Sequence, residues 1–236
     1  MSARPVILLL SGSLRMGSTN EAVLRTAQVV APSTMARAVI YDGLAELPHF
    51  NPDDDTDPLP LSVTRLRAAI ERAAGILICT PEYAGTLPGS FKNLLDWTVG
   101  GTEICAKPVA WVNAAAPGRG GGAEATLRAV LGYTGADIVE SACVKIPVDR
   151  GTVDEDGLIS DPEVCRQLAE VLRLLVASGE RASVADWAGL LAGGHVASCP
   201  ASWGRVLAAA AEHDREGPRE AGFEVFVAQR EVVPAS

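Results

Sequence analysis

Short apolar runs alternate along the chain with segments whose apolar residues recur at helical spacing. The third run, residues 75–80, is apolar on both faces, which is typical of a parallel strand covered by helices on each side. The alternation predicts an α/β fold in which a doubly wound sheet of five parallel strands carries helices on both faces. The expected strands are residues 6–10, 38–41, 75–80, 108–113 and 142–146. The expected helices are residues 21–27, 64–74, 87–99, 123–132 and 162–177.

The regular alternation ends near residue 178. We therefore expect residues 1–178 to form one domain and residues 179–236 to be a C-terminal extension of unknown role. The extension holds helical patterns at 184–191 and 204–212 and a strand-like alternation at 223–227. A lid, a dimer arm and a small ordered appendage all fit this pattern.

The composition suits a packed globular protein. Hydrophobic residues make up 48% of the 236 residues and charged residues 21%, so we expect a large core. The net charge of −9 argues against nucleic acid as the main partner, because a phosphate backbone repels an acidic surface. No apolar run approaches the roughly 18 residues of a membrane span, and the N-terminus leads straight into a strand without a signal-peptide pattern. We expect no membrane contact and a cytoplasmic location.

No metal site is expected. The five cysteines are scattered and form neither a Cys-x-x-Cys pair nor a cluster with histidine, which suits a reducing compartment and excludes a zinc site. Asp53, Asp55 and Asp57 alternate as in a calcium-binding loop. Pro58 stands where such a loop requires glycine, however, and Thr64 stands where it requires glutamate. We interpret this segment as a solvated loop.

The loop after the first strand has the composition of a phosphate-binding loop. Residues 11–20 are rich in serine, threonine and glycine, and they lead from a buried strand into the start of a helix. The free N–H groups and the dipole of a first helical turn attract an anion, and Gly12 and Gly17 let the backbone approach it closely. A serine-rich turn that only caps the helix is the alternative. The side chains able to donate to an anion are Ser11, Ser13, Arg15, Ser18 and Thr19.

Two common phosphate-binding loops are excluded here. The loop has no Gly-Lys-Ser/Thr ending, as in nucleoside-triphosphate loops, and no Gly-x-Gly-x-x-Gly dinucleotide fingerprint. Hydroxyl groups without a lysine suit a terminal monophosphate. Two further loops, residues 80–90 and 114–122, follow the third and fourth strands. Because ligands of such sheets bind at the carboxyl ends of the strands, the three loops are expected to surround one flat ligand.

Two motifs in these loops resemble the NADPH-dependent FMN reductase family of flavodoxin-like proteins. They are residues 12–20, GSLRMGSTN, and residues 80–97, TPEYAGTLPGSFKNLLDW. The resemblance covers roughly residues 4–178. It implies an NAD(P)H-dependent flavin oxidoreductase, in which hydride passes from NADPH or NADH to bound FMN and electrons pass on to free flavin, a quinone or another small acceptor. A flavodoxin-like electron carrier and a non-catalytic flavin-fold subunit are the alternatives.

The resemblance also assigns residues to the cofactor. The first loop would hold the FMN phosphate, the second would line the isoalloxazine ring through backbone amides, and the third would approach its pyrimidine end. The implied phosphate ligands are Ser13, Arg15, Ser18, Thr19 and Asn20, with Ser11 beside them. The implied ring-lining residues are Pro81, Glu82, Tyr83 and Gly85, followed by Ala115, Gly118 and Gly120 of the third loop.

Three features of these loops bear on substrate preference, proton transfer and anion binding. Family members usually have asparagine where this chain has Ala84, and a polar residue often stands where residues 114–116 are alanine, which puts substrate preference in doubt. Glu82 is a weak candidate for a proton donor, and we favour a role in shaping the loop. The glycines of residues 118–122 with Arg119 are a weak candidate for a second phosphate cradle.

The helix expected over residues 87–99 predicts oligomerisation. Leu87, Phe91 and Trp97 cannot all share the face that packs on the sheet, so bulky apolar surface is left over. The family resemblance points the same way, towards a homodimer or a tetramer. The alternative is a monomer in which the C-terminal extension covers this surface.

Overall fold

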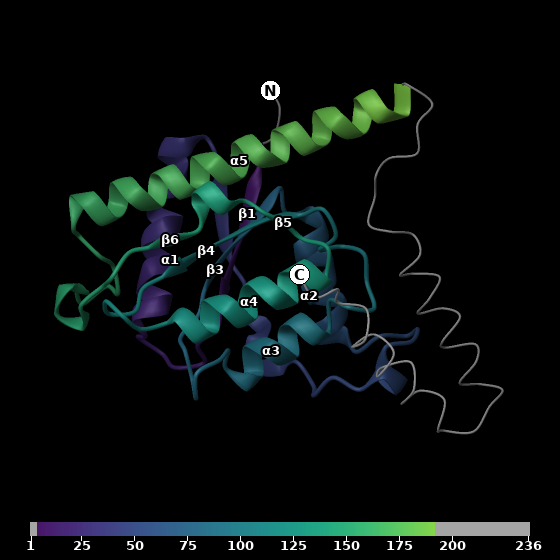
Figure 1. Ribbon diagram of the computed structural model, residues 1–236, viewed down its shortest axis with the longest axis horizontal. Helices are drawn as coiled ribbons and strands as arrows, with labels where there is room; N and C mark the ends of the chain where they lie inside the picture. Colours follow the sequence, from purple (N-terminus) through teal and green to yellow (C-terminus); the bar gives the residue numbers. More distant parts are fainter. Residues whose placement is uncertain (1–3, 192–236) are drawn as a thin grey trace, which may run out of the picture. The chain divides into compact units, whose positions relative to one another are not determined.

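The computed structural model describes the backbone of residues 4–191 and the side chains of residues 4–180. Its sheet has the strand order β2-β1-β3-β4-β5, and every pairing is parallel. The expectation of a doubly wound α/β fold is confirmed (Figure 1). The four longer strands are β1 Val6–Ser11, β2 Arg37–Ile40, β3 Gly75–Cys79 and β4 Pro108–Asn113. The α-helices are α1 Thr19–Val30, α2 Leu61–Arg72, α3 Gly89–Asp96, α4 Gly121–Tyr133 and α5 Pro162–Leu191.

The expected fifth strand is divided into two short strands. β5, Asp137–Ile138, pairs with the start of β4, and β6, Val144–Lys145, pairs with its end. A 3-10 turn at Glu140–Ala142 separates them. The prediction of one strand at 142–146 is therefore wrong in detail, because this turn interrupts the ladder along β4. The sheet has six strands where five were expected.

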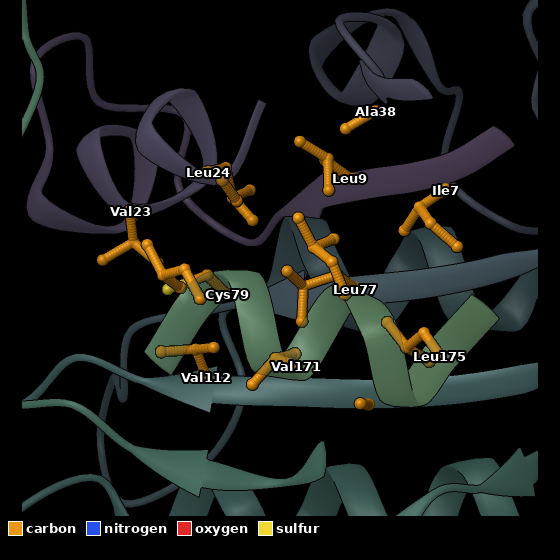
Figure 2. Packing of buried hydrophobic residues seen from close by; sticks show 14 of the residues in the cluster. Ile7, Leu9, Val23, Leu24, Ala38, Leu77, Cys79, Val112, Val171 and Leu175 are labelled. Carbon is orange, nitrogen blue, oxygen red and sulfur yellow. The ribbon is translucent and has the colours of Figure 1, made fainter. Parts of the chain in front are cut away.

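Helices cover both faces of the sheet. In β1, Ile7 and Leu9 face α1 and α5, whereas Leu8 and Leu10 face α2, α3 and α4. All four side chains are at most 3% exposed. Figure 2 shows the first of these cores, in which Val171 of α5 packs over the strands. The near-continuous apolar composition of the strands follows from this coverage on both faces.

α5 extends further than the sequence pattern predicts. The expected helix ends at residue 177, whereas α5 continues to Leu191. The expected boundary at residue 178 therefore falls inside a helix, and the division into residues 1–178 and 179–236 stays a prediction. The patterns at 204–212 and 223–227 lie outside the described residues.

The bulky apolar side chains on α3 and at its two ends are covered within the chain. Leu87, Phe91 and Trp97 are at most 4% exposed, so the expectation that one of these three leaves bulky apolar surface is wrong. The reason is the segment between β2 and α2, which packs along α3. Phe50 lies edge-on to Trp97 at 5.0 Å between ring centroids, and the Trp97 indole N–H donates to the Pro48 carbonyl at 2.8 Å.

A buried ion pair anchors the same segment. Asp55 was expected in a solvated loop, yet its side chain and that of Arg67 on α2 are each only 11% exposed. Arg67 Nη2 donates to Asp55 Oδ1 at 2.7 Å and to the Trp97 carbonyl at 3.0 Å. The interpretation as a solvated loop is therefore wrong for Asp55, because Arg67 reaches it from a helix that is distant in the sequence.

Candidate functional site

The three loops meet at the carboxyl end of the sheet. They follow β1, β3 and β4, and the strand order reverses direction between β1 and β3, where ligands of such sheets bind. The Gly12 N–H donates to the Cys79 carbonyl at 2.9 Å. A Cβ at residue 12 would lie 2.0 Å from Thr80 Oγ1, so only glycine lets the first two loops approach this closely.

The first loop presents unused hydrogen-bond donors. Within the described residues the N–H groups of Thr19 and Asn20 have no acceptor, as expected in the first turn of α1. Arg15 is exposed, and its guanidinium contacts no acceptor in residues 4–180. Gly17 has a φ of +61°, a left-handed conformation that turns the loop into the helix. Free donors and the positive end of a helix dipole are what an anion site requires.

The serine hydroxyls of this loop are partly in use. Ser18 is the N-cap of α1, and its Oγ accepts the Glu21 N–H at 3.2 Å. The capping role is therefore correct for Ser18, whose O–H remains available to donate. Ser11 donates to the Ser13 carbonyl at 3.3 Å, and Ser13 Oγ accepts the Arg15 N–H at 3.2 Å. Of these three hydroxyls, only that of Ser11 is used as a donor within the loop.

Cys79 contributes to the first loop, although the sequence did not single it out. Its thiol donates to Asn20 Oδ1 at 3.3 Å. Burial raises the pKa of the Cys79 thiol to about 12, so the sulfur keeps its proton and remains a donor. The side-chain oxygen of Asn20 is thereby used as an acceptor. Its side-chain nitrogen, Nδ2, has no acceptor among the described residues. The sequence signal that could have revealed this role is the position of Cys79, a residue with a polar thiol, at the end of a buried strand.

The second loop forms a tight hairpin. Tyr83 and Thr86 exchange two backbone hydrogen bonds, of 2.9 and 3.1 Å. Between them, Ala84 and Gly85 have φ values of +51° and +77°, so both central residues are left-handed, as in the two-residue turns that favour Asn-Gly. The Tyr83 N–H is consumed by this turn, whereas those of Glu82 and Gly85 have no acceptor in the described chain. The ring-lining amides expected here are thus reduced to those of Glu82 and Gly85.

Replacing Ala84 by asparagine should stabilise the protein. A left-handed conformation costs an alanine about 1 kcal/mol, and asparagine tolerates it better. We expect the free energy of unfolding in urea to rise by about 0.5 kcal/mol. The control is Ala129→Asn in the exposed face of α4, which should lower it by about 0.6 kcal/mol through helix propensity alone. An Ala84→Asn protein no more stable than wild type would show that the turn is not strained.

Glu82 does not point a free carboxylate into the site. Its Oε2 accepts the N–H groups of Gly122 and Ala123 at 2.7 and 3.1 Å, in the first turn of α4. These bonds favour the loop-shaping role over the proton-donor role expected as the weaker alternative. They also occupy the Gly122 amide, one of those in residues 118–122, and the second phosphate cradle expected there stays a prediction.

The third loop is shaped by Asn113, a residue that no sequence motif singled out. This residue ends β4 and is 5% exposed. Its Oδ1 accepts the Ala115 N–H at 2.9 Å, and its Nδ2 donates to Glu124 Oε1 at 2.9 Å. The N–H group of Ala115, a residue implied to line the ring, is therefore already used within the loop. Gly118 and Gly120 have φ values of +80° and +83°, which brings the loop back into α4.

The arrangement can hold a flat ligand that ends in an anion. Unused N–H groups and Arg15 lie at the start of α1, while the hairpin after β3 supplies the unused N–H groups of Glu82 and Gly85. Such a set recognises a phosphate by charge and an aromatic heterocycle by neutral hydrogen bonds. The fold and the loops together define a flavodoxin-like α/β protein with its ligand edge at the β1–β3 switch point.

The chain belongs to the NADPH-dependent FMN reductase family, whose model matches residues 5–150. The expectation from its two motifs is confirmed. The chain is 32% identical to an NAD(P)H-dependent FMN reductase of Pseudomonas aeruginosa over 177 residues, 72% of this chain and 94% of the relative. It is 30% identical to an NAD(P)H:quinone oxidoreductase of Solanum tuberosum over 184 residues, 75% and 95% of the two chains.

Other matches are shorter or structural. A quinone reductase of Escherichia coli is 37% identical over 98 residues, 41% of this chain, and the match spans about half of that relative, 52%. The solved structure of FerB, a flavoenzyme NAD(P)H:(acceptor) oxidoreductase from Paracoccus denitrificans, superposes with a TM-score of 0.65 at 28% identity. That superposition covers 75% of this chain and 98% of FerB. It confirms the flavodoxin-like fold.

Proposed function

We propose that this protein is an NAD(P)H-dependent flavin oxidoreductase that carries FMN and reduces a small acceptor such as free flavin or a quinone. The observation that carries the proposal is the pairing of a donor-rich loop at the start of α1 with a tight two-residue hairpin after β3. The names of the relatives from Pseudomonas aeruginosa and Solanum tuberosum, an FMN reductase and a quinone oxidoreductase, support the same activity.

The residues present fit FMN. Its phosphate would be held by Arg15 and the N–H groups of Thr19 and Asn20, with the hydroxyls of Ser13 and Ser18 as further donors. Ser11 would act indirectly, through its bond to the Ser13 carbonyl.

The ring would lie against the second and third loops. The N–H groups of Glu82 and Gly85 would donate to it without titrating, with Pro81 and Tyr83 alongside. Gly118 and Gly120 would let the third loop approach its pyrimidine end, with Ala115 contributing backbone shape rather than a donor. Bound FMN would supply the chemistry, accepting hydride from a reduced nicotinamide and passing electrons to the acceptor.

Anaerobic reduction tests the activity. The purified protein is loaded with FMN, and NADPH is added without oxygen while the flavin absorption band is followed. We expect the band to bleach within seconds and to return when a quinone is added. Slow or absent bleaching in a protein that does bind FMN would identify an electron carrier or a non-catalytic subunit instead. The same titration with NADH measures the nucleotide preference.

The proposal includes a cytoplasmic homodimer, or a dimer of such dimers. None of the helices in the described part of the chain combines the length and hydrophobicity that a membrane span requires. Large apolar side chains on the ligand loops support association: Leu14, Met16 and Tyr83 are 55%, 91% and 54% exposed, and such surface often marks a partner contact. One chain has a mass of 24.5 kDa. Light scattering at micromolar concentration should give at least twice that mass.

A further inference from the structure

We propose that the Glu82 side chain is a positioning residue that fastens the hairpin at Tyr83–Thr86 to α4 and so sets the affinity of the site for the flavin ring. This inference rests on the proposed function, because it assumes that the hairpin faces the ring. It concerns a side chain that contacts the first turn of α4, and not the flavin.

The hairpin and α4 are joined at three points. Glu82 Oε2 accepts two N–H groups of the first turn of α4. Thr86 Oγ1 lies 2.9 Å from Thr126 Oγ1, one helical turn further along α4. Between these bonds the backbones touch, since a Cβ at Gly122 would lie 2.1 Å from the Gly85 carbonyl oxygen.

Electrostatics make the carboxylate the strongest of these links. The N–H groups at the start of a helix carry partial positive charge, and hydrogen bonds from them to a carboxylate are charge-assisted. The α4 N-terminus has no side-chain cap of its own, since its N-cap is Gly120. Glu82 therefore fills the capping position from a different loop, 40 positions away in the sequence.

Few other contacts fix the hairpin. Residues 82–86 are all exposed, so packing contributes little to their position. Without the carboxylate, the two-residue turn can still form, but the hairpin as a whole can move relative to the end of β3 and to α4. If the hairpin then spends one-tenth of its time in the binding arrangement, the apparent Kd for the ring rises about tenfold.

The test compares Glu82→Ala, Glu82→Gln and wild type, with FMN and riboflavin as ligands and fluorescence quenching as the readout. Glu82→Ala should weaken both ligands by about tenfold, because the ring is common to them. Glu82→Gln keeps an acceptor oxygen and should recover much of the loss. The control is Glu163→Ala, which removes a carboxylate from the first turn of α5 and should leave both affinities unchanged.

A second measurement needs no flavin. Amide hydrogen exchange at residues 83–87 should be faster in Glu82→Ala than in wild type, while exchange in the strands stays unchanged. A folded Glu82→Ala protein with wild-type riboflavin affinity would overturn the inference. So would a Glu82→Gln protein that binds no better than Glu82→Ala. Failure of the wild-type protein to bind either flavin would instead overturn the proposed function, and the exchange result would still report on the link to α4.

Discussion

Replacing Arg15 by alanine should weaken FMN binding about ten- to a hundredfold and leave riboflavin binding unchanged. The guanidinium is exposed, has no partner among residues 4–180, and lies in the loop that precedes α1. A charge-assisted hydrogen bond to a phosphate contributes on the order of 1.5–3 kcal/mol, which corresponds to that range of affinity. Riboflavin lacks the phosphate and should not sense the change.

Fluorescence titrations of both flavins, at one fixed salt concentration, measure the effect. Arg37→Ala is a matched control, because the Arg37 side chain is also exposed and makes no hydrogen bond or ion pair with the described residues, but it begins β2 at the opposite end of the sheet. It should leave FMN affinity within twofold. Equal losses of FMN and riboflavin in Arg15→Ala would show that Arg15 supports the loop and does not bind phosphate.

Replacing Arg67 by methionine should lower the free energy of unfolding by about 3–5 kcal/mol. The substitution leaves the Asp55 carboxylate buried without its cation and removes both hydrogen bonds to the Trp97 carbonyl. A buried charge without a partner is strongly destabilising. Urea denaturation, followed by circular dichroism, gives the change in midpoint and slope.

The same helix offers a control for this prediction. Arg65 pairs with Glu46 at 3.7 Å, but both side chains are more than 60% exposed, so Arg65→Met should cost less than about 1 kcal/mol. Adding Asp55→Leu to Arg67→Met should recover part of the loss, since no charge then remains buried. Similar costs for Arg65→Met and Arg67→Met would mean that the buried pair does not anchor the segment between β2 and α2.

Much of the fold could be predicted from local sequence patterns. β4 was expected at residues 108–113 and lies there, and β1, β2 and β3 differ from expectation by one residue at one or both ends. The fifth strand was the exception. Its two parts, β5 and β6, depend on which portion of β4 each can reach, and apolar spacing carries no information about that.

The sequence predicted which loops form the candidate site. It did not predict which side chains in and around those loops bind one another. The three loops meet where strand order places them. The side-chain hydrogen bonds that hold the loops in place were not foreseen: Cys79 to Asn20, Glu82 to α4, and Asn113 to Ala115 and Glu124. Each is formed by polar groups with an unremarkable spacing in the sequence, so no motif signals the pairing.

The sequence by itself determined the order of strands and helices, the position of the ligand loops and membership of the FMN reductase family, because periodicity and motifs are local properties. Only the tertiary structure decided what covers α3 and what Glu82 binds. Trp97 meets Pro48 across 49 positions, and Glu82 meets Gly122 across 40. Such contacts form only when the sheet brings distant segments together. Local sequence patterns predict only hydrogen bonds between residues that are close in the sequence, so they cannot identify these partners.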